Sequence, residues 1–91
     1  MSKILKKELI PIGSVVLLKQ GTKPIMVYGR KHPVQEESGT KIYDYVACPY
    51  PEGYLLNAIS FFFDHSKIDK ILHMGYINED EKYLKIELLS T

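Results

Sequence analysis

The 91 residues have the length of one domain and an ordinary globular composition. Hydrophobic residues make up 45% of the chain and charged residues 25%, which excludes a disordered tract. Twelve basic against eleven acidic residues leave a formal net charge of +1. Nucleic-acid binding needs a concentrated basic face, so we expect a single domain over residues 1–91 that has no nucleic acid as its main partner.

The cysteine content and the apolar segments favour a cytoplasmic protein. Cys48 is the single cysteine, so an internal disulfide is excluded and a reducing compartment is indicated. Lysines followed by the apolar run 9–18 imitate a signal peptide, but Glu8, Pro11 and Gly13 interrupt the pattern and no cleavage site follows. No run approaches the ~20 apolar residues of a membrane span. We therefore expect neither a cleaved signal nor a membrane partner.

The first third of the chain predicts a β-hairpin. Residues 2–9 are expected either as a short helical turn or as a frayed end. Strand-forming apolar runs at 15–18 and 25–30 flank a polar turn at 19–24, which is the pattern of two antiparallel strands. Gly29 inside the second run indicates a bulge or a sharp bend.

The middle of the chain predicts an exposed connection and a third strand. Residues 32–40 are polar and contain Pro and Gly, which is typical of a loop. Residues 42–47 alternate as a strand, with Tyr43 and Tyr45 on one face. Asp44 lies between apolar neighbours on the other face, so that face either borders a sheet edge or supplies a donor to the carboxylate.

The last third predicts a strand, a turn, a second strand and a helix. In the strand at 59–63, Phe61 and Phe63 share one face and Phe62 takes the other; we expect core packing and the C-terminal helix to cover these rings. Residues 64–69 resemble one turn capped by Asp64 or Ser66. The segment 68–77 fits a helix or a strand, and a strand is favoured.

The helix that follows has a clear start. Asn78 is a good N-cap, Glu81 follows three residues later as in a capping box, and Glu79 and Asp80 suit the first turn. Its apolar stripe consists of Tyr83, Leu84, Ile86, Leu88 and Leu89. The predicted fold is α+β: about five short antiparallel strands, forming a bent sheet or a small SH3-like barrel, with this helix packed on it.

The stretch 43–54 is the strongest candidate for a binding surface. It holds four of the seven tyrosines and two of the five prolines, and prolines stiffen a loop that then presents aromatic rings at low entropic cost. The residues expected to contact a protein partner are Tyr43, Tyr45, Tyr50, Pro51, Glu52, Tyr54 and Phe62. The same surface would serve a homodimer.

No residue pattern in the chain indicates catalysis, a cofactor or a metal. Asp64, His65 and Ser66 are the residue types of a hydrolase triad, but neighbours in sequence do not adopt that geometry. No histidine pair has ligand spacing, and Cys48 has no second cysteine. We therefore expect no enzyme activity, no cofactor and no metal site.

Several segments together resemble one known family, over roughly residues 9–77. They are Pro11–Leu18, Met26–Arg30, Tyr43–Val46, Pro49–Gly53, Phe63–His65 and Gly75–Tyr76. The family is a group of small Firmicute proteins catalogued as domain-of-unknown-function family 4176, often encoded beside type VII secretion components and LXG-type toxins. The resemblance implies a cytosolic chaperone, targeting factor or adaptor whose partner is an LXG-type toxin or a secretion component. The alternatives are a toxin immunity protein and a nucleic-acid-binding small barrel.

Overall fold

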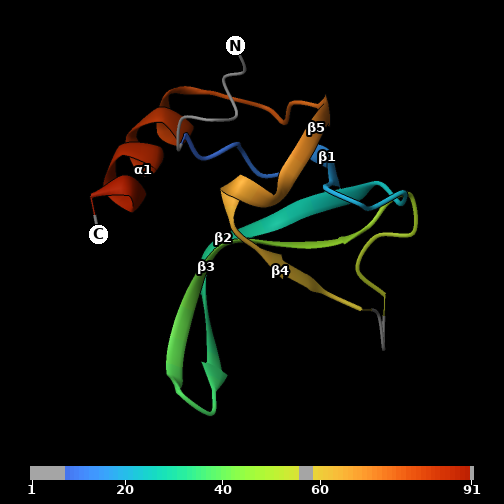
Figure 1. Cartoon of the computed structure of the whole chain (residues 1–91). Coiled ribbons are helices and arrows are strands. Elements are labelled where there is room, and N and C mark those ends of the chain that lie inside the picture. Colours follow the sequence, from blue (N-terminus) through green and yellow to red (C-terminus); the bar gives the residue numbers. More distant parts are fainter. Residues whose placement is uncertain (1–7, 56–58, 91) are drawn as a thin grey trace.

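The computed structural model describes residues 8–55 and 59–90, so the expected helical turn at 2–9 lies largely outside the described residues. In chain order the elements are β1 (Val15–Leu18), β2 (Ile25–Glu36), β3 (Gly39–Pro49), β4 (Phe61–Phe63), the 3₁₀ turn η2 (His65–Lys67), β5 (Ile68–His73) and α1 (Glu79–Leu89) (Figure 1). The strands form one antiparallel sheet of order β4-β3-β2-β1-β5. The α+β prediction is confirmed in its bent-sheet form, because β4 and β5 do not pair and the barrel stays open among the described strands.

The predicted first hairpin is confirmed. Val16 of β1 pairs with Ile25 of β2, and the pairing of β2 with β3 shifts register between Val27 and Gly29, which is the expected bulge. A Cβ atom at Gly29 would lie 2.7 Å from Cγ1 of Val46. Glycine thus lets the backbone of β2 approach a side chain of β3 at the bend.

The prediction of a loop at 32–40 is wrong. β2 and β3 stay paired out to Glu36 and Gly39, so a two-residue turn closes a long hairpin arm that projects from the body of the sheet (Figure 1). Both faces of this arm are largely exposed. This exposure explains why its sequence does not alternate between apolar and polar residues. Backbone pairing forms the strands here, assisted by the Tyr43 hydroxyl, which donates to a Glu36 carboxylate oxygen at 2.9 Å.

The hydrophobic core lies on one face of the sheet, where alternate residues of every strand point. Its buried members are Leu9, Ile10, Val16, Ile25, Val27, Tyr45, Ala47, Phe63 and Ile68. Leu88 is the residue of α1 that packs against this cluster. The rest of the predicted apolar stripe of the helix is exposed, including Tyr83 and Ile86, so the expectation that the stripe packs on the sheet is wrong for all but Leu88.

Helix α1 begins where the sequence predicts and is held by an ion pair. The side chain of Asn78 accepts a hydrogen bond from the Glu81 amide at 2.9 Å. Arg30 on β2 donates to both carboxylate oxygens of Glu81 at 2.8 and 2.9 Å, and also to the Ile10 carbonyl at 3.3 Å. The two charged side chains are only 3% and 12% exposed. A bidentate, desolvated contact of this kind fixes geometry as well as attraction.

The segment 68–77 is a strand over its first six residues, as favoured, and the helical alternative is wrong. After β5 the chain crosses the start of β1 at very short range. The Gly75 amide donates to the Ser14 hydroxyl at 2.9 Å, and a Cβ atom at Gly75 would lie 2.1 Å from the Ile12 carbonyl oxygen. Only glycine fits this crossing.

Candidate functional site

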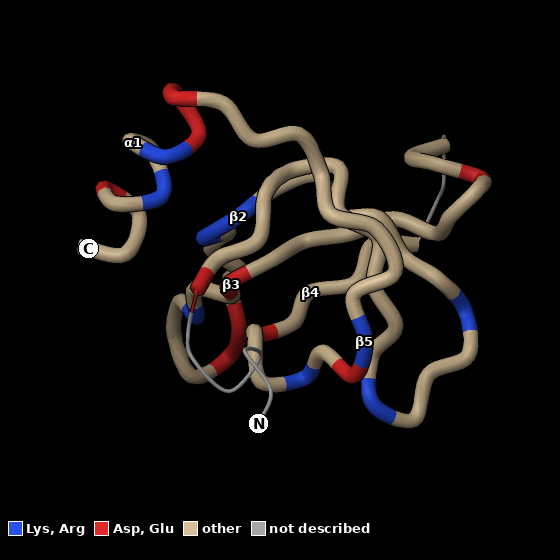
Figure 2. The backbone as a smooth tube through the Cα atoms, turned by 90° about the horizontal axis from the view of Figure 1, so that it is seen from above, with Lys and Arg blue, Asp and Glu red and all other residues tan. Residues whose placement is uncertain are grey.

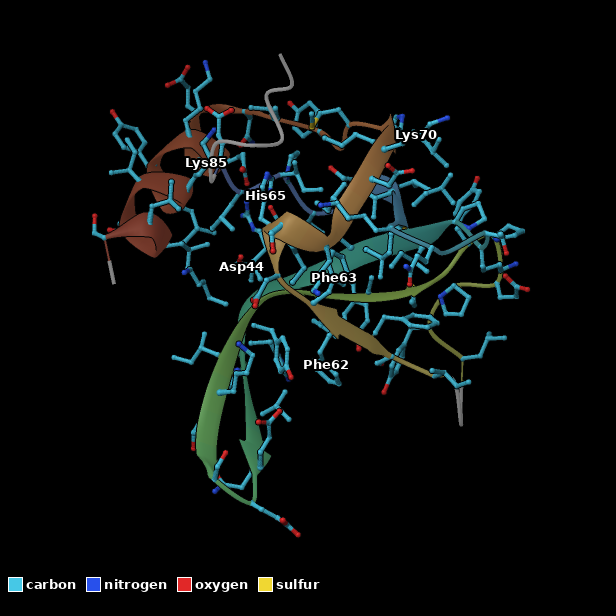
Figure 3. The ribbon with its side chains drawn as sticks, viewed as in Figure 1. Asp44, Phe62, Phe63, His65, Lys70 and Lys85 are labelled. Carbon is cyan, nitrogen blue, oxygen red and sulfur yellow. The ribbon has the colours of Figure 1, made fainter. Side chains whose placement is uncertain are left out.

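Two of the predicted binding residues, Tyr43 and Phe62, lie on the face of the sheet opposite the core, which we call the open face. Val16, Ala47 and Phe63 belong to the core cluster, so their strand neighbours point to the other side. Phe62 and Phe63 leave β4 in opposite directions (Figure 3), and Phe62 is 39% exposed against 4% for Phe63. The predicted alternation of the phenylalanines is thus confirmed, whereas α1 packs through Leu88 on the core side and does not cover Phe62.

One aromatic group on the open face joins β4 to the base of the hairpin arm. The Phe62 ring lies 5.4 Å from the His32 ring and 6.0 Å from the Tyr43 ring, centroid to centroid. The Lys41 ammonium lies 4.7 Å from the centroid of Tyr43, within cation–π range. The hydrogen bond to Glu36 raises the pKa of the Tyr43 hydroxyl. These contacts fix the orientation of the rings.

A second aromatic group holds the proline-containing loop near the sheet. The rings of Tyr28 on β2 and Tyr54 in the loop are 5.3 Å apart, and the Tyr28 hydroxyl lies 2.7 Å from the Ser60 hydroxyl, just before β4. Tyr54 is nevertheless largely exposed. The loop therefore presents an aromatic side chain beside the open face.

A shallow pocket lies at the other end of the loop and reaches β1 and β5. Its volume is about 510 Å³, and its lining includes Val15, Pro24, Met26, Tyr50, Leu72 and His73. The Tyr50 amide donates to the Pro24 carbonyl at 2.9 Å, so the backbone of the loop is tied to the β1–β2 turn. Next to it, the hydrogen bond from Lys23 lowers the pKa of the Glu52 carboxyl, and the two side chains form an exposed ion pair at 2.9 Å.

The structure distributes the predicted binding residues over these features, with one correction. Tyr43 and Phe62 share the first aromatic group, Tyr54 belongs to the second, Tyr50 lines the pocket, and Pro51 and Glu52 are exposed beside it. Tyr45 is fully buried, so its prediction as a contact residue is wrong. Its ring belongs to the core cluster whereas the Tyr43 ring lies beside Phe62, so the prediction that these two tyrosines share one face is wrong. The Tyr45 hydroxyl is satisfied on the core side.

The Tyr45 hydroxyl is part of a buried polar network. It accepts a hydrogen bond from the Ile10 amide at 3.0 Å and lies within hydrogen-bonding distance, 2.7 Å, of Nδ1 of His65. Burial raises the pKa of Tyr45, and the hydrogen bond from Ile10 opposes that shift. The network joins the segment before β1, the strand β3 and the turn η2, and so fixes the positions of these three segments relative to one another.

Asp44 extends the same network, which decides between the alternatives left open by its sequence. Its Oδ2 atom accepts from the His65 amide at 2.9 Å, and its Oδ1 atom lies 3.6 Å from the Lys31 ammonium (Figure 3). The buried carboxylate is thus stabilised by a hydrogen-bond donor and by a positive charge. Asp64 starts η2 as its N-cap residue but makes no capping hydrogen bond with its side chain; instead it accepts from the Asp44 amide at 3.2 Å.

Sequence reasoning missed several residues of the two aromatic groups and of the pocket. Tyr28, Met26 and His32 lie on β2, and Leu72 and His73 lie on β5. Tyr28 follows the core residue Val27 at the bulge, which was the available signal for a residue turned outward. The remaining members come together only through the pairing of strands distant in sequence.

Within residues 8–55 and 59–90, no three His, Cys, Asp or Glu side chains are grouped as metal ligands. In the same ranges, no helix has the length and apolar character needed to cross a bilayer. The Cys48 thiol is buried and lies 3.7 Å from the Met26 carbonyl, to which it donates.

These features define a small α+β domain with a bent five-stranded sheet and an aromatic open face. The profile of a family described as a domain of unknown function (DUF4176) matches residues 9–84. The chain belongs to this family, which confirms the resemblance found in the sequence. Comparison with curated proteins and with solved structures gives no match.

Proposed function

We propose that this protein is a small cytosolic accessory protein that binds another protein through its open face and carries out no catalysis. The observation that carries the proposal is the convergence of aromatic side chains from β2, β3, β4 and the proline-containing loop on the sheet face opposite the core. Aromatic rings bury large areas and lose little side-chain entropy, which is why they dominate protein interfaces.

The partner we propose is an LXG-type toxin or a component of a type VII secretion system, with this protein as chaperone, targeting factor or adaptor. Support for this choice comes from the family resemblance. The exposed loop residues Tyr50 and Tyr54 are the anchors, because both rings present large apolar area without belonging to the core. Homodimerisation through the same face would compete with the partner.

Affinity purification of the tagged protein from its native cytosol tests this proposal. We expect the toxin or secretion component to be recovered with the unchanged protein and lost with the double variant Tyr50→Ala, Tyr54→Ala. The matched control is Tyr76→Ala with Tyr83→Ala, which removes two exposed tyrosines from the linker and helix α1. Circular dichroism verifies that both variants fold. Equal recovery with all three proteins would refute Tyr50 and Tyr54 as the docking anchors.

Truncated toxins then identify the kind of accessory. A chaperone or targeting factor binds the N-terminal secretion domain, whereas an immunity protein binds the C-terminal toxic domain. Binding of the C-terminal domain alone would replace the proposed role by immunity.

A further inference from the structure

The charge near the pocket at β5 is predominantly positive. Lys19, Lys67 and Lys70 are exposed, and no acidic side chain within the described residues forms an ion pair with any of them. By contrast, ion pairs are formed by Lys23, Arg30, Lys31, Lys41 and Lys82. An unneutralised group of lysines beside an apolar pocket indicates which charge a ligand should carry.

The three lysines are neighbours in space. Lys70 of β5 stands opposite Leu17 of β1, and the Lys19 amide donates to the Lys67 carbonyl at 2.9 Å. Blue segments accordingly gather along β5 and the loop beside it (Figure 2). Asp69 is the acidic residue of this stretch, so the edge keeps a positive net charge.

Lys70 also lies close to the apolar lining of the pocket. It precedes Leu72 by two residues on β5, a separation of about 7 Å along a strand. Lys70 itself extends from the part of β5 that lies away from α1 (Figure 3). A ligand that fills the pocket next to Leu72 therefore has its adjoining groups within reach of the Lys70 ammonium.

The shape of the pocket favours a segment of a larger molecule over an enclosed small ligand. Small-molecule sites bury most of the ligand in a deep cleft, whereas this pocket is open to solvent and adjoins the aromatic loop through Tyr50. Its volume of about 510 Å³ accommodates one large side chain together with the chain that carries it.

We propose that this pocket binds an extended segment of a protein partner in which a large apolar side chain stands about two residues from a carboxylate. The apolar side chain enters between Met26, Tyr50 and Leu72, and the carboxylate meets Lys70. This inference rests on the proposed function, and it adds the partner's sequence chemistry and a second contact region beside the aromatic groups.

Nuclear magnetic resonance titration of the full chain with capped heptapeptides tests the inference. One probe carries a central phenylalanine with glutamates two residues before and after it. The second has lysines in place of the glutamates, and the third has serine in place of the phenylalanine. We expect saturable shifts of the β5 amides and of the residues around Pro24. The glutamate probe should bind at least about fivefold more tightly than the lysine probe, with a difference that shrinks as salt is added.

Two variants locate the effect. Lys70→Glu should abolish or reverse the preference for the glutamate probe, and the control Lys82→Glu on α1 should leave it unchanged. Leu72→Ser, which removes the apolar side chain without adding charge, should weaken the binding of both probes that carry phenylalanine. Both Lys70 and Leu72 are exposed, so these changes spare the core. Absence of saturable shifts at β5, or equal affinity for the two charged probes, would overturn the inference.

The outcome is separable from that of the affinity purification, because the probes do not depend on the native partner. A toxin recovered through Tyr50 and Tyr54, together with no response of β5 to the peptides, overturns the role of the pocket and leaves the proposed function standing. A selective response of β5 with no recovered protein partner contradicts the proposed function instead.

Discussion

Replacing Glu81 by Ala tests whether a single ion pair holds helix α1 on the sheet. Arg30 and Glu81 are 3% and 12% exposed and share two hydrogen bonds. Removal of Glu81 leaves the Arg30 guanidinium desolvated and without its carboxylate, with the Ile10 carbonyl still as an acceptor. Uncompensated burial of a charge is among the few single changes with a large effect on stability.

The expected loss in the free energy of unfolding depends on the cost of an unpaired buried charge and on whether α1 can leave the sheet. Loss of one partner from a buried ion pair costs about 3–5 kcal/mol. Helix α1 contains no fully buried residue and packs on the core through Leu88, so it can leave the sheet and let water reach Arg30. That release limits the loss in the free energy of unfolding to about 2–4 kcal/mol, out of the roughly 5–14 kcal/mol typical of a domain of this size.

Urea unfolding and amide hydrogen exchange measure the two parts of this expectation. Glu81→Ala should lower the unfolding midpoint and reduce protection in α1 before protection in β2 and β3 is lost. The matched control is Glu87→Ala, an exposed glutamate of the same helix, for which we expect a change within about 0.5 kcal/mol. If the two variants have equal stability, or if α1 keeps its protection, the reasoning is refuted.

Three further changes test the core, the chain crossing and the buried hydroxyl. Phe63→Ala should destabilise the fold by about 3–5 kcal/mol because that ring is buried, whereas Phe62→Ala should cost about 1 kcal/mol or less; similar unfolding midpoints for the pair would contradict the assigned faces. Gly75→Ala should cost at least about 2 kcal/mol, since its Cβ atom would meet the Ile12 carbonyl at 2.1 Å, and an unchanged melting temperature would show that the crossing is looser than described. Burial raises the pKa of Tyr45 above the ordinary value of 10.0, so the folded chain retains a proton that the unfolded chain releases. Stability is therefore complete below pH 10 and falls as the pH rises above it; Tyr45→Phe should lower stability by about 1–3 kcal/mol near neutral pH and flatten the alkaline decline, and an equally steep decline in the variant would count against this assignment.

Local sequence patterns were sufficient for several elements. The apolar runs of the first hairpin, the alternation of the three phenylalanines and the cap at Asn78 act within a few residues, so each could be identified without knowledge of the rest of the chain. The same patterns failed for residues 32–40, because a ribbon exposed on both faces has no apolar face to reveal it. Backbone pairing alone forms that arm.

The candidate site was determined partly by the sequence and partly by the tertiary structure. The sequence determined that Tyr43, Tyr50, Tyr54 and Phe62 are aromatic residues on strands or on a stiff loop. It also determined that neighbours on a strand point to opposite faces, but not which face would be covered. Only the tertiary structure decided that Tyr45 is buried, because that outcome depends on core residues and on partners far along the chain. The Arg30–Glu81 pair likewise joins residues 51 positions apart, and contacts at such separations are set by how the sheet bends and where α1 packs, which no local pattern encodes.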